Sequence, residues 1–292
     1  MTVGLIRRIF HKIKIGFTRI GESPIPDTTA CKKYGDQGEK EFFDTIQTYL
    51  PDCRIKKNIV IQTAEGNAEI DCLLLCKNKL FAIEVKRWKG RLVEQADGFV
   101  QYKQDFYTDE VHTKVHHSPF KQLDRAVYLL KRQIPGNAWI NKVVFFEESD
   151  GVETDGGVWF DNYDGLIAYI HGDGKASSGK DASAFFDECI AADYLYCSLS
   201  ERFLNCSPSE RSLHCVVCDD SLRFTTSTGV LDRSNIRSMS IEHHWSYDEV
   251  EITTKDGECY TVTVENGSLF VIENGHRERY ALCKLDYIHL GD

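Results

Sequence analysis

Apolar residues recur every three or four positions along five stretches of the chain, which is the spacing that places them on one face of an α-helix. The pattern predicts helices over residues 3–20, 36–50, 119–134, 165–170 and 184–195. The stretch 98–110 is also expected to be helical, wholly or in part. Pro119 suits the first turn of its helix, and Pro51 marks the end of another.

Shorter runs rich in branched and aromatic residues lie between these helices and predict strands. They cover residues 53–62, 68–75, 79–88, 141–146 and 158–162. Strands and helices mixed in this way indicate an α/β core.

From residue 207 onward, short strands alternate with turn residues. The dipeptides Asp256-Gly257, Asn266-Gly267 and Asn274-Gly275 are strong signals of hairpins. We therefore expect three parts, listed by residue: an N-terminal helix and linker in 1–30, an α/β domain in 31–200, and a small, mainly antiparallel β domain in 207–292.

The first helix is basic as well as amphipathic, because residues 3–20 contain six basic residues and no acid precedes Glu22. Such a helix can pack on its own protein or on a second subunit. It can also lie on a membrane surface or contact phosphates. The sequence leaves these alternatives open.

Composition limits the class of protein. No run approaches the ~20 apolar residues of a membrane-spanning helix, and no signal-peptide pattern is present. Eleven cysteines, an odd number set in apolar runs, suit reduced thiols in a cytoplasmic protein. Cys197, Cys206, Cys215 and Cys218 could form a zinc site, but they contain only one C-x-x-C pair, so buried core cysteines are the favoured alternative.

The net charge of −10 does not exclude nucleic acid, because the charge is unevenly distributed. The segment 144–200 contains twelve acidic residues against Lys175 and Lys180, and so accounts for the whole net charge. The rest of the chain is close to neutral and contains basic clusters.

Two acids and a lysine interrupt the core-like segment EIDCLLLCKNKLFAIEVK. A two-residue loop at positions 77–78 would set Asp71 opposite Glu84, and a loop at 78–79 would set Asp71 opposite Lys86. In either register all three share one face, because opposed residues and residues i and i+2 point the same way. Two carboxylates about 5 Å apart repel each other unless a cation lies between them, and Mg²⁺ prefers such ligands.

Glu39 lies along the apolar stripe of the helix predicted over residues 36–50. Burying a carboxylate without a partner is costly, so this is an unusual position for an acid without a function. Alternatively, Glu39 is a helix-start acid favoured by the helix dipole. The sequence alone does not decide between the two.

Several spaced segments together resemble the PD-(D/E)XK nuclease superfamily, and more specifically the nuclease-related domain (NERD) family. In order along the chain they are GDQGEKEFF with Glu39, the strand residue Asn58, AEIDCLLL with Asp71, IEVKRWKG with Glu84 and Lys86, HSPFKQLDRAVYLLKRQI with Gln122, and NKVVFF. The resemblance covers about residues 34–148. It departs from the superfamily at Ile70, where the superfamily has proline, and at Ser118, where asparagine is expected.

The resemblance implies a restriction-endonuclease-like core, in which helices flank a mixed central sheet, and a Mg²⁺- or Mn²⁺-dependent deoxyribonuclease. The implied metal ligands are Asp71, Glu84, the main-chain carbonyl of Val85, and Glu39. Lys86 would position and activate the attacking water and stabilise the transition state. Gln122 would orient substrate or water.

Six basic residues are available as contacts to DNA phosphates. They are Arg87, Arg91, Lys103, Lys114, Lys121 and Arg125. Trp88 is expected to pack beside the hairpin rather than to stack on a base. His116 and His117 are expected in a loop or at a phosphate rather than on a metal.

The resemblance further implies a role in prokaryotic defence against foreign DNA or in DNA processing. Specificity would come from a homo-oligomer, a partner protein or the β domain, whose hairpins bear a loose likeness to a PH-like domain. Two alternatives remain. One is a catalytically silent binding module, and the other is a sensor or scaffold held at a membrane by residues 1–20.

Overall fold

The computed structural model describes residues 30–292 apart from 97, 105–109, 135, 178–180, 199–209, 220–221, 227–228, 245–246, 266, 274–275, 283–284 and 292. The helix predicted over residues 3–20 therefore lies outside the described residues. The described chain forms two compact units that divide between Ala191 and Ala192. This division precedes the expected boundary at residue 200, because strand β8 (Asp193–Ser198) pairs with strands of the C-terminal unit. None of the helices in the described ranges is long and apolar enough to cross a membrane.

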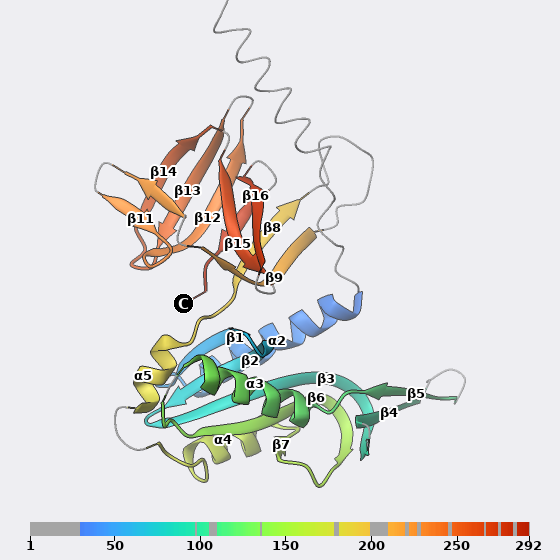
Figure 1. The fold of residues 1–292 in the computed structure, drawn as a ribbon. Helices are drawn as coiled ribbons and strands as arrows, with labels where there is room; N and C mark the ends of the chain where they lie inside the picture. Colours follow the sequence, from blue (N-terminus) through green and yellow to red (C-terminus); the bar gives the residue numbers. More distant parts are fainter. Residues whose placement is uncertain are drawn as a thin grey trace, which may run out of the picture. The chain divides into compact units, whose positions relative to one another are not determined.

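A seven-stranded mixed sheet forms the centre of the N-terminal unit (Figure 1). Its strands are β1 (Arg54–Thr63), β2 (Gly66–Cys76), β3 (Lys79–Gln95), β4 (Gly98–Gln104), β5 (Val111–His116), β6 (Ile140–Glu153) and β7 (Val158–Phe160). Strands β1 to β5 follow one another antiparallel. Strand β6 runs parallel to β3 along most of its length and also pairs with β7. All five strands predicted for this unit are present.

Helices cover both faces of this sheet. On one face, α3 (Pro119–Gln133) and α5 (Asp181–Glu188) pack on one apolar cluster. On the other face, α2 (Ala30–Tyr49) and α4 (Tyr163–His171) pack on a second cluster. The unit is therefore an α/β structure of three layers, as the mixed pattern indicated. Ser118 caps α3 by accepting a hydrogen bond from the Lys121 N–H at 3.4 Å, so serine serves where asparagine was expected.

The helix predicted over all or part of residues 98–110 is wrong for residues 98–104, which form strand β4, and residues 105–109 lie outside the described residues. Strand β4 pairs with the second half of β3 and with β5, which the sequence analysis did not predict. Gly98 has φ 147°, and a Cβ there would lie 2.1 Å from the His116 carbonyl oxygen, so only glycine permits this close approach of the two strands. Phe99 is fully buried in the cluster under α3, and this tertiary contact outweighs the local helical pattern.

The C-terminal unit is built from strands, with no α-helix among its described residues. Besides β8 they are β9 (Glu210–Cys218), β10 (Arg223–Thr225), β11 (Val230–Asp232), β12 (Ile236–His243), β13 (Asp248–Thr254), β14 (Cys259–Val264), β15 (Ser268–Glu273), β16 (His276–Ala281) and β17 (Tyr287–His289). Eight of them form a sheet in the order β14-β13-β12-β17-β8-β9-β15-β16, and β10 pairs with β11.

Two of the three predicted hairpins are present in this unit, β13–β14 around Gly257 and β15–β16. The third prediction, at Asn266-Gly267, is wrong because β14 and β15 are not neighbours in the sheet. A Cβ on Gly267 would lie 2.4 Å from Leu282 Cδ1, so this glycine serves close packing instead of a reversal. Of the four cysteines considered for zinc, only the Cys218 side chain is described. It is buried, and burial raises its pKa.

Candidate active site

Strand β3 has a free stretch on the edge that faces β2 and β4. Strand β2 pairs with β3 only as far as Ile83, and β4 pairs only from Arg91 onward. Strand β6 pairs along the other edge from Leu80 to Val93, with register shifts between Arg87 and Arg91. Among the described residues, no strand pairs with this edge of β3 between these two points, and the stretch contains Glu84, Val85 and Lys86.

Asp71 lies where the pairing of β2 with β3 ends, while β2 continues to pair with β1 beyond it. The β2–β3 pairing ends at Cys72 and Ile83, one step before Asp71. Instead of a main-chain carbonyl, the Asp71 carboxylate accepts the hydrogen bond of the Val85 N–H, at 2.7 Å from Oδ2. On β1, Asn58 stands opposite Asp71 in the register and has φ 48°, so the β1–β2 pairing is also interrupted here.

The three charged residues of the hairpin meet on one face of the sheet. The turn is at residues 77–78, which sets Asp71 opposite Glu84 in the register. Leu80 and Ala82 on β3 pack in the cluster under α3, so by strand alternation Glu84 and Lys86 point to the same side. The Lys86 ammonium donates a short hydrogen bond to Glu84 Oε1.

The two carboxyl groups are held in an environment that disfavours their charge. The Glu84 side chain has no exposed surface, and burial together with the Asp71 charge raises the pKa of Glu84 to about 8, although Lys86 acts in the opposite direction. Burial also raises the pKa of Asp71, while the Lys86 charge and the hydrogen bond from Val85 act to lower it. Burial without full compensation is the dominant cause for both groups.

Lys86 remains a cation in this setting. Burial alone would lower the pKa of its ammonium, but the charges of Glu84 and Asp71 outweigh burial and raise it. The lysine is therefore protonated at neutral pH and supplies a positive charge at the open stretch of β3.

One oxygen atom of this group is suited to a bound cation. Glu84 Oε2 is buried and accepts no hydrogen bond within the described part of the chain. A buried carboxyl oxygen without a hydrogen-bond donor is costly, and this oxygen together with the neighbouring Asp71 carboxylate can serve as ligands of a hard divalent cation. The donor set therefore fits Mg²⁺ or Mn²⁺.

Glu39 approaches the group from helix α2, whose apolar residues cover the other face of the sheet. The helix begins at Ala30, so Glu39 is in its third turn and the helix-dipole explanation for this acid is wrong. The side chain is half-buried, and its charge contributes to raising the pKa of Lys86. The acid therefore acts on the site electrostatically.

Arg87 fixes this helix against β3. Its side chain is only 12% exposed and forms ion pairs with Glu41 of α2 at 3.0 Å and with Glu147 and Glu148 of β6. A Cβ on Gly38 would lie 2.6 Å from Arg87 Cδ, so glycine allows the helix to approach at this point. The expected phosphate contact for Arg87 does not agree with this geometry, because three carboxylates surround the guanidinium.

We predict that Arg87→Met destabilises the N-terminal unit by about 2–4 kcal/mol near pH 8 and by much less near about pH 4.5. Burial raises the pKa of Glu147 and Arg87 lowers it, so removing Arg87 raises this pKa further above its unfolded value. A carboxyl group whose pKa is higher in the folded than in the unfolded protein destabilises the fold at pH values where it is ionised. This destabilisation disappears as the pH falls and the group becomes protonated in both states. Urea unfolding at both pH values measures this.

The matched control is Arg91→Met, since Arg91 is 59% exposed and pairs with the exposed Glu153. We expect it to cost less than about 1 kcal/mol at either pH. Equal losses for Arg87→Met at both pH values would show that lost packing, rather than charge, is responsible.

The remaining predicted site residues lie at varying distances from this group. Gln122 is in the first turn of α3, on the same side of the sheet, with an exposed side chain that makes no hydrogen bond to Asp71, Glu84 or Lys86 among the described contacts. Five of the six proposed phosphate contacts are exposed: Arg91, Lys103, Lys114, Lys121 and Arg125.

Trp88 and His116 form a stacked pair beside Lys86 that the sequence analysis did not find. Their ring centroids are 4.1 Å apart, and His116 Nε2 lies 2.9 Å from Gln101 Oε1. Burial lowers the pKa of His116, and the nearby charges of Lys114 and Lys86 act in the same direction. Trp88 packs beside the hairpin as predicted. The loop position expected for His116 is wrong, because His116 is the last residue of β5, a strand that was not predicted.

One of the comparisons with known proteins finds a match. No curated protein and no solved structure matches the chain. The family model described as the nuclease-related domain matches residues 34–147, which include Glu39, Asp71, Glu84 and Lys86. The PD-(D/E)XK superfamily is consistent with that family. Residues 34–147 thus match the nuclease-related domain (NERD) family, the family that the spaced segments of the sequence resemble.

Proposed function

We propose that this domain hydrolyses DNA phosphodiester bonds with the help of a divalent cation. The observation that carries the proposal is the Glu84 carboxylate, which is buried beside a second carboxylate and leaves Oε2 without a hydrogen bond among the described atoms. Such an arrangement costs stability in the free protein, and a cation would offset that cost. A purely structural role for Glu84 does not explain it.

The proposed fold is a restriction-endonuclease-like core. The features that support it are the mixed sheet, the helices on both faces, and the opening of β3 at the two acids and the lysine. A divergence of strands at the functional residues is what allows a substrate to approach the middle of a sheet edge.

Asp71, Glu84, the main-chain carbonyl of Val85 and Glu39 would hold Mg²⁺ or Mn²⁺. When bound, the cation would lower the pKa of a water molecule and neutralise charge on the leaving oxygen. The hydrogen bond from the Val85 N–H fixes the orientation of the Asp71 carboxylate, with Oδ2 held at 2.7 Å. Asp71 Oδ2 accepts this bond, and Glu84 Oε1 accepts one from Lys86. Of these two carboxylates, Asp71 Oδ1 and Glu84 Oε2 are therefore the oxygen atoms available to the cation.

Lys86 would stabilise charge that develops on the phosphate and hold the attacking water by a hydrogen bond. Because the pKa of Lys86 is raised, its side chain stays protonated at neutral pH. Lys86 therefore would not act as the general base that takes a proton from the attacking water. Gln122, exposed on the first turn of α3, would hydrogen-bond the substrate or the water.

The β4–β5 hairpin would bind the DNA backbone next to this group. Phe99, Gln101 and Lys103 stand opposite His116, Lys114 and His112, so all six side chains share one face. The same face carries Trp88, which stacks on His116 and follows Lys86 by two residues. The exposed Lys103 and Lys114 are therefore on the side of the sheet where the scissile phosphate would lie.

We predict that the double variant Lys103→Ala/Lys114→Ala weakens DNA binding with little change in the cleavage rate of bound DNA. Each phosphate contact contributes about 0.9 to the slope of log affinity against log salt concentration, so the slope should fall by about 2. Binding to labelled duplex DNA at several salt concentrations, in Ca²⁺ to prevent cleavage, measures this.

Lys77→Asn is the control, because Lys77 is an exposed lysine in the turn at the other end of β3. Its φ of 58° suits asparagine. This variant should keep the slope of the wild type. An unchanged slope for the double variant would exclude the β4–β5 hairpin from the DNA interface.

Incubation of the full chain with plasmid, linear duplex and single-stranded DNA, with Mg²⁺, Mn²⁺ or a chelator, tests the proposed function. We expect cleavage that requires the cation and disappears in Asp71→Asn. If no DNA or RNA substrate is cleaved and the cation does not bind, the domain is a silent binding module. The proposed biological role, in defence against foreign DNA or in DNA processing, rests on the family resemblance alone.

A further inference from the structure

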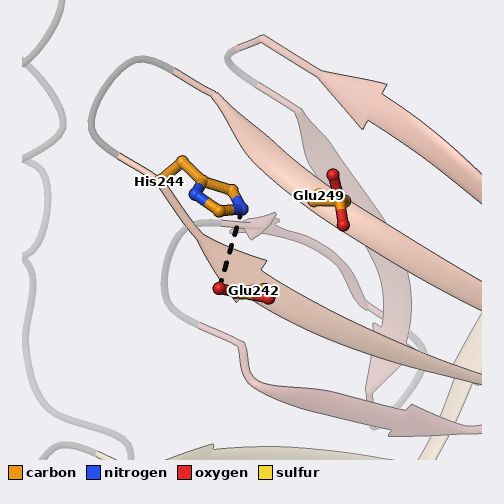
Figure 2. Close-up of side chains that lie close together, drawn as sticks. All are labelled: Glu242, His244 and Glu249. Carbon is orange, nitrogen blue, oxygen red and sulfur yellow. Dashed lines mark ion pairs between the residues drawn. The ribbon is translucent and has the colours of Figure 1, made fainter.

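Two glutamates stand directly opposite each other near one end of the β12–β13 hairpin of the C-terminal unit. Glu242 on β12 pairs with Glu249 on β13 in the antiparallel register, and Figure 2 shows their carboxylates on neighbouring strands. Like charges directly opposite each other destabilise a strand pair. A positive charge between them would remove this cost.

His244, the residue that follows β12, points its ring at these glutamates (Figure 2). Its Nε2 lies 3.7 Å from Glu242 Oε1, and one ligand atom from each of the three residues lies within 4.8 Å of the others. Nε2 is buried and makes no hydrogen bond within the described part of the chain. A buried ring nitrogen without such a bond, aimed at two carboxylates, is a free metal-ligand position.

The orientation of this ring is held from behind. Tyr247 stacks on His244 with centroids 4.7 Å apart and an interplanar angle of 29°. The main-chain N–H of His244 also donates to the Tyr247 carbonyl at 3.0 Å. Both contacts leave Nε2 pointing toward the glutamates, and a ligand whose orientation is fixed loses less entropy on binding.

The preceding residue, His243, shows the contrast. Its Nδ1 lies 2.7 Å from an Asp248 carboxylate oxygen, and its Nε2 lies 3.4 Å from an Asp286 carboxylate oxygen. Both contacts are on the face of the β12–β13 pair opposite to the two glutamates. Of the two consecutive histidines, His243 is thus engaged by aspartates, and only His244 faces the glutamates.

We propose that Glu242, His244 and Glu249 bind one divalent transition-metal ion, with Zn²⁺ as the best match. One imidazole and two carboxylates, with water as a fourth ligand, form a set that Zn²⁺ accepts at about 2.0–2.2 Å. Glu242 is 72% exposed and can rotate to close the distances. The ion would join β12 and β13, and it would be separate from the oxygen-ligand site of the nuclease domain.

Calorimetric titration of the full chain with ZnCl₂ tests this, with excess Mg²⁺ present to occupy the nuclease site. We expect one Zn²⁺ per chain in this unit, and a loss of affinity of at least about tenfold in Glu242→Gln and in Glu249→Gln. Both changes are at accessible side chains and preserve their size. Glu251→Gln, an exposed glutamate two residues along β13, is the matched control and should bind Zn²⁺ like the wild type.

A second measurement is the melting temperature, which Zn²⁺ should raise in the wild type and in Glu251→Gln but not in the two ligand variants. Zn²⁺ binding equal in all four proteins would overturn the proposal. So would Zn²⁺ binding that is lost only in Asp71→Asn, or a wild type that binds none.

Discussion

Glu84→Gln is expected to lose both divalent-cation binding and DNA cleavage, whereas Lys86→Met is expected to lose cleavage and still bind the cation. Glutamine has nearly the shape of glutamate, but it carries no charge and presents only one oxygen where Glu84 has a buried Oε2. Lys86 is a cation beside the same carboxylates. Its removal takes away a competitor for them, so metal affinity in Lys86→Met should be unchanged or higher.

The expected effects are large because both residues act in a buried environment, where charges are weakly screened. We expect cleavage to fall by about 10²- to 10⁴-fold in either variant. Mn²⁺ affinity should fall at least about tenfold in Glu84→Gln only. Single-turnover cleavage together with calorimetric Mn²⁺ titration separates the two effects.

Two exposed positions provide controls of the same residue types. Glu153→Gln removes a 56% exposed carboxylate of β6, and Lys77→Asn removes an exposed lysine at the β2–β3 turn. Both should cleave DNA like the wild type. If Lys86→Met also lost Mn²⁺ binding, the lysine would hold the site together structurally, and its assignment to transition-state charge would be wrong.

The arrangement of Asp71, Glu84 and Lys86 was accessible from sequence because it depends on local rules. A two-residue turn fixes which residues are opposed, and strand alternation fixes which share a face. Both turn positions considered gave the same face, so the choice between them did not matter. Helix α2 was also largely predictable, since Phe42, Phe43, Ile46 and Leu50 recur at helical spacing and are all buried.

What the sequence analysis missed depends on partners far away in the chain. Arg87 was assigned to phosphate because nothing nearby in sequence shows that Glu41, Glu147 and Glu148 surround it. One signal was available: Arg87 follows Val85 by two residues, so it points to the face opposite Glu84. Strand β4 was read as a helix because its burial comes from pairing with β3 and β5, not from its own periodicity.

Asp193→Ala is expected to destabilise the C-terminal unit by about 3–5 kcal/mol, the largest loss of stability that we predict for a single change. Asp193 begins β8 and is fully buried. Its Oδ2 accepts from the Cys218 N–H at 2.6 Å and from Arg233 Nε at 3.1 Å, and its Oδ1 accepts from Arg233 Nη2 and the Gly291 N–H, both at 2.8 Å.

One carboxylate therefore joins the first strand of the unit to β9, to the residue after β11 and to the penultimate residue of the chain. Removing it would leave two main-chain N–H groups without their acceptor and a largely buried guanidinium without its partner. Since a domain of this size is stable by only about 5–15 kcal/mol, the change should leave the unit marginal or unfolded.

Hydrogen exchange followed by mass spectrometry can measure the two units separately. We expect faster exchange in the C-terminal unit of Asp193→Ala, with unchanged exchange in β2 and β3. Glu278→Ala, at an exposed position of β16, is the control and should exchange like the wild type.

The double variant Asp193→Ala/Arg233→Met should lose about 1–3 kcal/mol less stability than the two single variants lose together. The reason is that the double variant leaves no buried charge without its partner. Strictly additive losses would show that the carboxylate acts through the main-chain N–H groups of Cys218 and Gly291 alone. The strength of this coupling thus decides whether charge or hydrogen bonding holds the unit together at Asp193.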